Sequence, residues 1–235
     1  MTIALRQEAP GPLTAAAVTT VTTPAFGSNC LIGSAIAVWL QWGGSTLPTS
    51  VVDSASQAYT FSGVSAFDTN DGVTLALYYK LNNASATALT VTATWATGQP
   101  FQGIWAAEIS GATASPYQTG AGQDQVAPGT GTGVISSGNV TPTSQPCLLY
   151  AVSNDDGGNA SSVVAGGLTQ GTTGFQLSGS TAPGGTSAYQ RLTSTSAIAA
   201  TFTNTTDGGT RRFLTLASVW TEASSGSTAT IAWVV

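Results

Sequence analysis

The chain has 235 residues and a formal net charge of −5, and its charged residues make up only 6% of the total, against about 25% in an average globular chain. The acidic balance offers no basic patch that could neutralise phosphates, which argues against nucleic-acid binding. No apolar run approaches the length of about 18 residues that a membrane span needs. Arg6, Gln7 and Glu8 interrupt the opening segment, so it does not read as a secretory signal.

The first hundred residues alternate between turn-forming stretches and apolar strands. Residues 1–14 hold two prolines and a glycine, which break regular structure. We expect an arm there that packs on a neighbouring subunit or on its own domain. Residues 15–22 predict a first strand. Residues 34–42 (SAIAVWLQW) are almost continuously apolar, which predicts a central strand buried on both faces. Residues 51–54 and 57–61 predict a short hairpin.

The stretch from 73 to 95 has the clearest pattern in the chain. From Leu89 to Trp95, apolar residues alternate with threonines, and a period of two places them on opposite faces of a sheet. Residues 75–80 repeat the pattern less strictly. Residues 82–85 (NNAS) favour a turn, because Asn and Ser bond their own backbone. The stretch therefore predicts an antiparallel hairpin with one face on a hydrophobic core.

Two later segments predict buried strands. Residues 103–110 (GIWAAEIS) carry Trp105 and the isolated Glu108, and residues 147–154 (CLLYAVSN) read as a strong central strand. Residues 155–158 and 207–209 predict turns, and residues 159–185 are rich in glycine and weakly patterned. Shorter strands are predicted at 121–125, 133–140, 175–177, 186–192, 197–203, 213–222 and 228–235.

These elements predict an all-β chain with about twelve to fourteen strands and no helix. Strands spaced about ten residues apart with turns between them favour a single jelly-roll-like antiparallel β-sandwich. No shift in composition marks a boundary between domains. We expect an N-terminal arm (1–14), one β-sandwich domain (15–223) and a C-terminal strand (224–235) that could lie at a subunit interface.

Three segments resemble a known module. Residues 51–63 (VVDSASQAYTFSG), 75–95 and 104–112 (IWAAEISGA) are similar, in order, to a Ser/Thr/Gly-rich β-sandwich module of tailed-bacteriophage virion proteins and bacterial surface proteins. The chain departs from the module at Ser56-Gln57, where the module has Gly-Asn. The resemblance implies a β-sandwich used in the architecture of a particle or a cell surface, and it carries over no catalytic residue.

Candidate chemical groups are few. The chain has no histidine and no Cys-x-x-Cys spacing, which excludes a zinc site of standard type. Cys30 and Cys147 are interpreted as buried thiols in preference to a disulfide. Glu108 and Asp53 could form a glycosidase-like pair, but a hydrogen-bonded structural role for Glu108 is favoured. We expect no enzyme activity and no cofactor.

Three short polar motifs allow a binding interpretation beside a structural one. Residues 68–72 (DTNDG) faintly resemble a calcium loop, but the ligand spacing of an EF-hand is broken, so a tight turn is favoured. Residues 155–159 (DDGGN) receive the same interpretation. The basic pair at 211–212 is read as a solvated turn entering a strand in preference to an anion site. No metal site is expected.

The tryptophans are the remaining candidates for a functional surface. Core packing explains Trp39, Trp95, Trp105 and Trp220, which lie in strand patterns. Trp42 precedes Gly43-Gly44, and Trp233 lies in an apolar terminal segment that could extend a neighbour's sheet. The candidate interface residues are therefore Trp42, Trp233, Val234 and Val235.

Resemblance and composition together predict a structural virion protein, most simply a capsid decoration protein that bridges capsid subunits. Its expected partners are the major capsid protein and further copies of itself. A trimer would suit local threefold positions, by analogy only. Such a protein is assembled in the host cytoplasm into the virion and needs no signal peptide. The alternatives are a head- or tail-fibre component, or an adhesin module that binds a glycan through exposed Trp or Tyr; a glycosidase is a third.

Overall fold

The computed structural model describes residues 2–82, 86–126, 134–155, 162–174, 184–204 and 212–224. Within these ranges all regular structure is β, with no helix, and the sheets are antiparallel. The predicted all-β antiparallel sandwich is confirmed. The strands number sixteen in the described residues, a few more than the sequence predicts.

The strands divide into two consecutive sets of eight. The first set is β1 (Ala4–Pro10), β2 (Val18–Thr22), β3 (Ala35–Gly43), β4 (Ser50–Asp53), β5 (Thr60–Asp68), β6 (Val73–Leu81), β7 (Val91–Gln99) and β8 (Gly103–Ser110). The second set is β9 (Ala112–Val126), β10 (Val134–Val140), β11 (Cys147–Asp155), β12 (Ser162–Ala165), β13 (Thr169–Gly174), β14 (Gly185–Leu192), β15 (Ile198–Asn204) and β16 (Arg212–Glu222).

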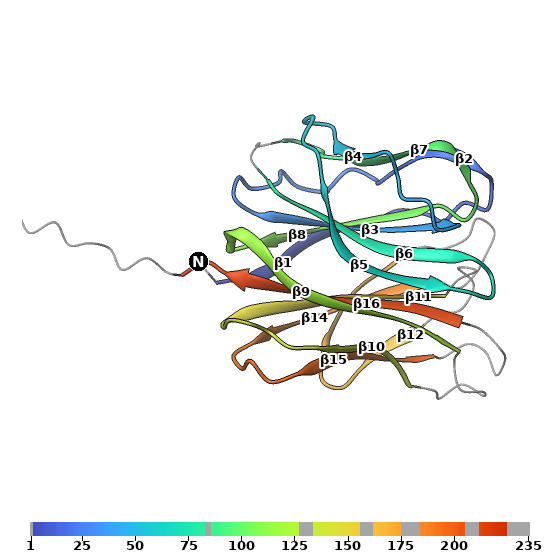
Figure 1. Cartoon of the computed structure of the whole chain (residues 1–235). Coiled ribbons are helices and arrows are strands. Elements are labelled where there is room, and N and C mark those ends of the chain that lie inside the picture. Colours follow the sequence, from blue (N-terminus) through green and yellow to red (C-terminus); the bar gives the residue numbers. More distant parts are fainter. Residues whose placement is uncertain are drawn as a thin grey trace, which may run out of the picture.

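Four sheets lie on one another as layers (Figure 1). The outer sheet β2-β7-β4 covers the inner sheet β1-β8-β3-β6-β5, and the outer sheet β10-β15-β12 covers the inner sheet β13-β14-β11-β16-β9. Three clusters of buried side chains fill the spaces between the layers. The central cluster lies between the two inner sheets and contains Trp39, Trp105, Tyr150 and Trp220.

The two sets of eight strands repeat one topology. In the first, the order is 1-8-3-6-5 in the inner sheet and 2-7-4 in the outer one; adding eight to each number gives the order in the second. First and last strands are neighbours, and the chain passes back and forth between two sheets, as in a jelly roll. In the first half, Ala58 also pairs with Val52 of β4 before β5 crosses to the inner sheet. The chain is thus two jelly-roll halves that pack back to back.

The stacking of the sheets explains why β3 and β11 are the two most apolar strands. Every residue of β3 and of β11 is buried, because each strand is the middle of an inner sheet with a core on both faces. On β3, Trp39 faces the central core while Trp42 faces the outer sheet. The prediction that residues 34–42 are buried on both faces is confirmed.

The prediction of an irregular arm is wrong for residues 4–10. They form β1, which pairs with β8 from Ala4↔Ser110 to Pro10↔Trp105. Pro10 stands at the end of this edge strand, where a missing N–H costs no ladder hydrogen bond. Pro10, Gly11 and Pro12, at the end of the segment and just after it, made it read as unstructured. The arm therefore belongs to its own domain.

The predicted hairpin at 73–95 is also wrong, although both of its strands exist. β6 pairs with β3 and β5 in the inner sheet, whereas β7 pairs with β2 and β4 in the outer sheet. A half-buried strand shows the same alternation whether its neighbour in sequence is beside it or across the core. The short hairpin predicted for residues 51–54 and 57–61 is confirmed, because Tyr59 N–H donates to the Val51 carbonyl at 2.9 Å.

The glycine-rich region contains strands that the sequence did not reveal. β12 and β13 lie within residues 159–185, where we predicted a single strand at 175–177. That predicted strand, and the one at 228–235, lie outside the described residues. β12 and β13 are short edge strands, and edges need little apolar patterning because one side has no partner.

Candidate functional site

The tryptophans predicted for the core are all in it. Trp39, Trp95, Trp105 and Trp220 are at most 2% exposed. Trp42, predicted at an interface, is 0% exposed, and its ring centroid lies 5.6 Å from that of Trp95. Its assignment to a surface is therefore wrong, because β3 has a second core on its outer face. Trp233, Val234 and Val235 lie outside the described residues.

The outer sheet β2-β7-β4 presents a neutral polar face. Its outward side chains form two rows across the strands, Thr20–Thr94–Ser50 and Thr22–Thr92–Val52. Oγ1 of Thr22 lies 2.9 Å from Oγ1 of Thr92, within hydrogen-bond distance. The row members are exposed or half-buried. β-Branched threonine suits a pleated surface in contact with water.

The opposite outer sheet, β10-β15-β12, has the same character. Its outward residues are again small and neutral, and pair as Val134↔Thr203 and Ser136↔Thr201. Across the six strands of both outer sheets the single charged residue is Asp53, which is 5% exposed. Within the described residues, both broad faces of the molecule are thus free of exposed charge.

A short apolar loop tip projects before β3. Leu31 is 40% exposed and Ile32 is 67% exposed. The tip is held from beneath, because the Leu31 carbonyl accepts hydrogen bonds from Ser34 Oγ and Asn82 Nδ2, both at 2.7 Å. The backbone N–H of Leu31 donates to Glu108 Oε1 at 2.6 Å.

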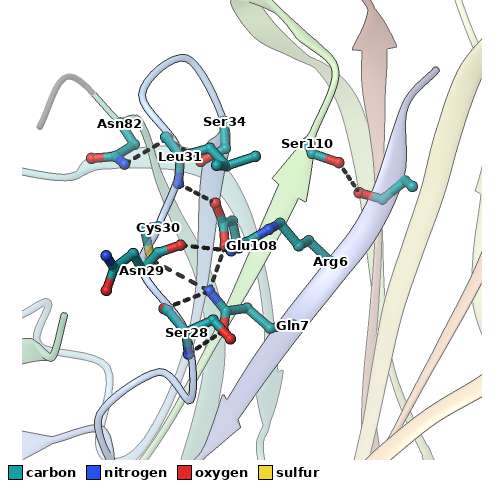
Figure 2. A network of polar contacts seen from close by, with 11 residues as sticks. Arg6, Gln7, Ser28, Asn29, Cys30, Leu31, Ser34, Asn82, Glu108 and Ser110 are labelled. Carbon is teal, nitrogen blue, oxygen red and sulfur yellow. Dashed lines mark hydrogen bonds and ion pairs between the residues drawn. The ribbon is translucent and has the colours of Figure 1, made fainter. Parts of the chain in front are cut away.

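Glu108 lies at the centre of a polar network beneath this loop (Figure 2). It is 0% exposed, and its Oε2 accepts hydrogen bonds from Arg6 Nη1 and Gln7 Nε2, each at 2.5 Å. A β-bulge between Leu5 and Gln7 sets two residues of β1 opposite one residue of β8, which turns both donors toward the carboxylate. The favoured interpretation of Glu108 as a hydrogen-bonded structural acid is confirmed.

Asp53, the other residue of the suggested glycosidase pair, also has both carboxylate oxygens engaged in hydrogen bonds within the protein. Its Oδ1 accepts the N–H groups of Ala55 and Gln57 at 3.0 and 2.9 Å, and its Oδ2 accepts Gln57 Nε2 at 2.9 Å and Tyr59 OH at 3.2 Å. A carboxylate that is buried and holds a turn in this way is not placed to meet a substrate. That the chain is not an enzyme stays a prediction.

The 68–72 segment is a turn, as favoured. Asn70 N–H donates to Asp68 Oδ1 at 2.7 Å, and Gly72 N–H donates to the Asp68 carbonyl at 3.0 Å. Gly72 has a φ of 69°, which suits glycine. Among the described residues no group of acidic, cysteine or histidine side chains gathers closely enough to hold a metal. Of the 155–159 segment, only Asp155 lies within the described residues.

Arg212 is not the solvated residue that the sequence predicts. Its Nε lies 2.8 Å from Asp68 Oδ1 and 3.0 Å from Asp124 Oδ1, and its side chain is 22% exposed. Asp68 belongs to the first half, and Asp124 to β9 of the second. The guanidinium thus joins the two halves at one edge. Arg211 lies outside the described residues.

Glu8 joins the halves at another edge. Its Oε1 accepts Tyr150 OH at 2.6 Å and Trp105 Nε1 at 3.2 Å, and its Oε2 accepts Thr172 N–H at 2.8 Å and Thr172 Oγ1 at 2.6 Å. A Cβ on Gly171 would lie 2.7 Å from Glu8 Oε2, so only glycine leaves the carboxylate this room. The role of Glu8 could not be predicted from the sequence, because its donors lie on other strands far away in the chain.

The cysteines are both free and buried. Cys30 belongs to the core under the first outer sheet and Cys147 to the core under the second, so the two inner sheets separate them. The interpretation as two buried thiols is confirmed, and the disulfide alternative is excluded.

Three buried tyrosines predict a loss of stability in alkaline solution. Burial raises the pKa of Tyr78 from 10.0 to about 12. Burial, and then the nearby Asp53 and Glu8 carboxylates, raise the pKa of Tyr59 and Tyr150 respectively. Because each folded pKa exceeds the unfolded value, the contribution to stability is complete below the unfolded pKa and is lost as the pH rises through the folded one.

Urea titrations at increasing pH measure this effect. We expect the unfolding midpoint to fall steadily above the ordinary tyrosine pKa of 10.0, and to fall less steeply in Tyr78→Phe. A midpoint that stays constant between pH 10 and 12 would mean that these phenols ionise freely in the folded chain.

Two hollows of the surface are lined by described residues alone. One, of about 290 Å³, lies at the β14–β15 turn between Gln190 and Ile198. The other, of about 180 Å³, lies between the halves and is lined by Tyr79, Tyr117 and neighbours. The two tyrosine rings stack, with centroids 5.1 Å apart. Neither hollow brings together acid, base and nucleophile.

No protein-family model matches the chain, and no curated protein matches it. In the described part of the chain, no helix has the length and hydropathy needed to cross a membrane. The functional assignment therefore depends on the surfaces described above.

Proposed function

We propose that the chain is a structural protein of a tailed-bacteriophage particle, and within that class a capsid decoration protein that bridges neighbouring subunits. The observation that carries the proposal is the pair of outer sheets, both broad, both neutral and both without exposed charge. An interface core depleted in charge is characteristic of stable protein contacts, because each buried charge costs desolvation energy.

The arrangement of the halves supports the same role. The outer sheets lie on opposite sides of one stack, so a single chain offers two similar faces pointing away from each other (Figure 1). Such a chain can touch one neighbour on each side. Jelly rolls serve in viral capsids and in lectins, and since fold alone does not decide between these uses, the neutral faces carry the proposal. The partners are the major capsid protein and other copies of this chain.

Light scattering of the purified chain tests the self-association that this proposal includes. We expect a stable oligomer, with a trimer as the simplest case, that falls apart when residues 226–235 are removed. A monomer indifferent to this truncation contradicts the role assigned to the terminal segment. If that monomer also binds on a glycan array, the carbohydrate-binding alternative becomes the better one, with the hollow at Tyr79 and Tyr117 as its site.

A charge placed on an outer face tests the surface itself. Thr92→Lys is expected to weaken the oligomer, or its binding to capsids, by at least tenfold, because the ammonium group would have to be desolvated in the contact. The matched control is Thr195→Lys, which adds the same charge to an exposed loop. If the two variants associate equally well, this outer face does not take part in the assembly contact.

A further inference from the structure

The hollow at the β14–β15 turn leaves one end of a hydrophobic core uncovered. Leu192 and Ile198, which belong to the core under the second outer sheet, line it together with exposed residues of the turn. Arg191 is the charged residue of the lining, and it is paired with Glu222. The volume of about 290 Å³ is just below the range of small-molecule sites, about 300–1,000 Å³. The hollow therefore suits a few apolar side chains.

The corresponding end of the first half is covered. There the β2–β3 connection, residues 23–34, runs beside the segment that leads into β7. Phe26 N–H donates to the Leu89 carbonyl at 3.0 Å, and Cys30 N–H donates to the Ala86 carbonyl at 3.3 Å. Phe26, Cys30 and Leu89 are at most 3% exposed and belong to the core under the first outer sheet. The connection thus places apolar side chains over the end of that core.

The second half has no counterpart of this cover among its described residues. The corresponding β10–β11 connection consists of residues 141–146 and is half as long. Within it, the N–H groups of Thr143 and Ser144 donate to Gln118 Oε1 at 2.8 and 3.3 Å, away from the β14–β15 turn. Because the two halves repeat one topology, the comparison shows that the second core lacks the apolar segment that covers the first.

The chain reaches the same end of the molecule once more, where β16 ends. Cys147 pairs with both Leu192 and Thr221, so β14 and β16 end at the same level of their sheet. The described part of the chain stops at Ser224, and residues 225–235 follow. Their last five residues, IAWVV, are all apolar. At about 3.3 Å per extended residue, the segment is long enough to span roughly 36 Å.

The last backbone bond of β16 directs the chain away from the hollow of the same molecule. Ala223 N–H donates to the Gly111 carbonyl at 2.8 Å, on the side of β16 where β9 pairs. The hollow lies on the other side, because β14 is two strands away across β11, a distance of about 10 Å. A second copy that meets this end of the molecule can receive the segment without a reversal of the chain.

We propose that residues 231–235 of one copy fill the β14–β15 hollow of a neighbouring copy, with Trp233 as the anchor against Leu192 and Ile198. Tryptophan is enriched among the residues that dominate binding energy. The segment and the hollow are different surfaces, so the contact is heterologous and gives a ring when the rotation between copies closes. The inference rests on the self-association included in the proposed function, and it names the site at which the terminal segment binds.

Filling the hollow tests the inference without a change in the core. Ala197→Tyr adds a large side chain at an exposed position that lines the hollow, and its matched control, Thr195→Tyr, adds the same side chain at an exposed position that does not. In light scattering, we expect Ala197→Tyr to weaken the oligomer at least about tenfold and Thr195→Tyr to leave it unchanged. An oligomer that tolerates Ala197→Tyr overturns the inference alone, whereas a monomeric wild-type chain overturns the self-association as well.

Disulfide trapping shows whose hollow is filled. Chains with Ala232→Cys are mixed with chains with Ser194→Cys and mildly oxidised. We expect a disulfide between the two kinds of chain, located by peptide mapping, and none when Ser194→Cys is replaced by Thr69→Cys, in the exposed turn after β5. Absence of the expected disulfide overturns the inference. In the Ala232→Cys, Ser194→Cys double variant, a disulfide formed only within single chains places the segment in its own hollow and overturns the exchange between copies.

Discussion

Replacing Trp39 by alanine is expected to lower the free energy of unfolding by about 4 kcal/mol. The indole is fully buried in the core between the two inner sheets, and its ring centroid lies 5.6 Å from that of Tyr150 in the other half. Truncation leaves a cavity that rigid sheets on both sides cannot close. Chemical denaturation followed by fluorescence and by circular dichroism measures the loss.

Trp39→Phe is the matched control, because it keeps an aromatic ring in the same place and should cost clearly less. The shared core also predicts one transition for both halves, seen at the same denaturant concentration by both probes. Two separate transitions in the wild-type chain would show that the halves are stable without each other, and that the central core does not couple them.

Removing the Glu108 carboxylate is expected to cost about 3 kcal/mol, because Glu108→Ala leaves the donors of Arg6, Gln7 and Leu31 without their common acceptor. Urea denaturation gives the difference.

Glu222→Gln serves as the control for Glu108. Glu222 pairs with Arg191, whose side chain is 39% exposed, with an Nε–Oε2 distance of 2.7 Å. Solvent screens such a pair, so its loss should matter much less. If both substitutions cost the same, the network around Glu108 adds nothing beyond an ordinary surface ion pair.

The sequence was sufficient for the fold class and for the most buried strands. β3 and β11 read correctly because a strand with a core on each face loses its alternation and becomes uniformly apolar. The four core tryptophans read correctly because they lie in strand patterns, Trp105 in a nearly uniformly apolar strand and Trp95 on the apolar face of the alternating β7. Trp42 did not, because the glycines after it suggested an exposed strand end and no local signal reveals a second layer above β3.

The pairing of strands within the sheets could not be predicted from the sequence. β7 alternates as a half-buried strand does, and the sequence of β6 alternates less strictly although most of this inner strand is buried on both faces. Whether the two strands pair or face each other across a core depends on their partners, and these come from four other strands. The repeat of eight strands is hidden for a related reason. Only the topology repeats. The two halves place different residues at their corresponding apolar and polar positions.

The polar site shows the same limit. Glu108 stood out as a lone acid in a buried strand, which by itself requires buried donors. Its donors could not be named, because Gln7 and Arg6 reach it only through a bulge in β1, about a hundred residues away in the chain. Cys30 likewise gave no sign of its neighbours.

The most direct test of the proposed function is the location of the chain in an infected culture. Phage particles made from the genome that encodes it should be purified on a density gradient and labelled with an antibody against the folded chain. We predict that the chain sediments with the particles and that the label covers the head in a regular pattern. A chain that stays in the soluble fraction, with no label on any particle, would contradict a structural role in the virion.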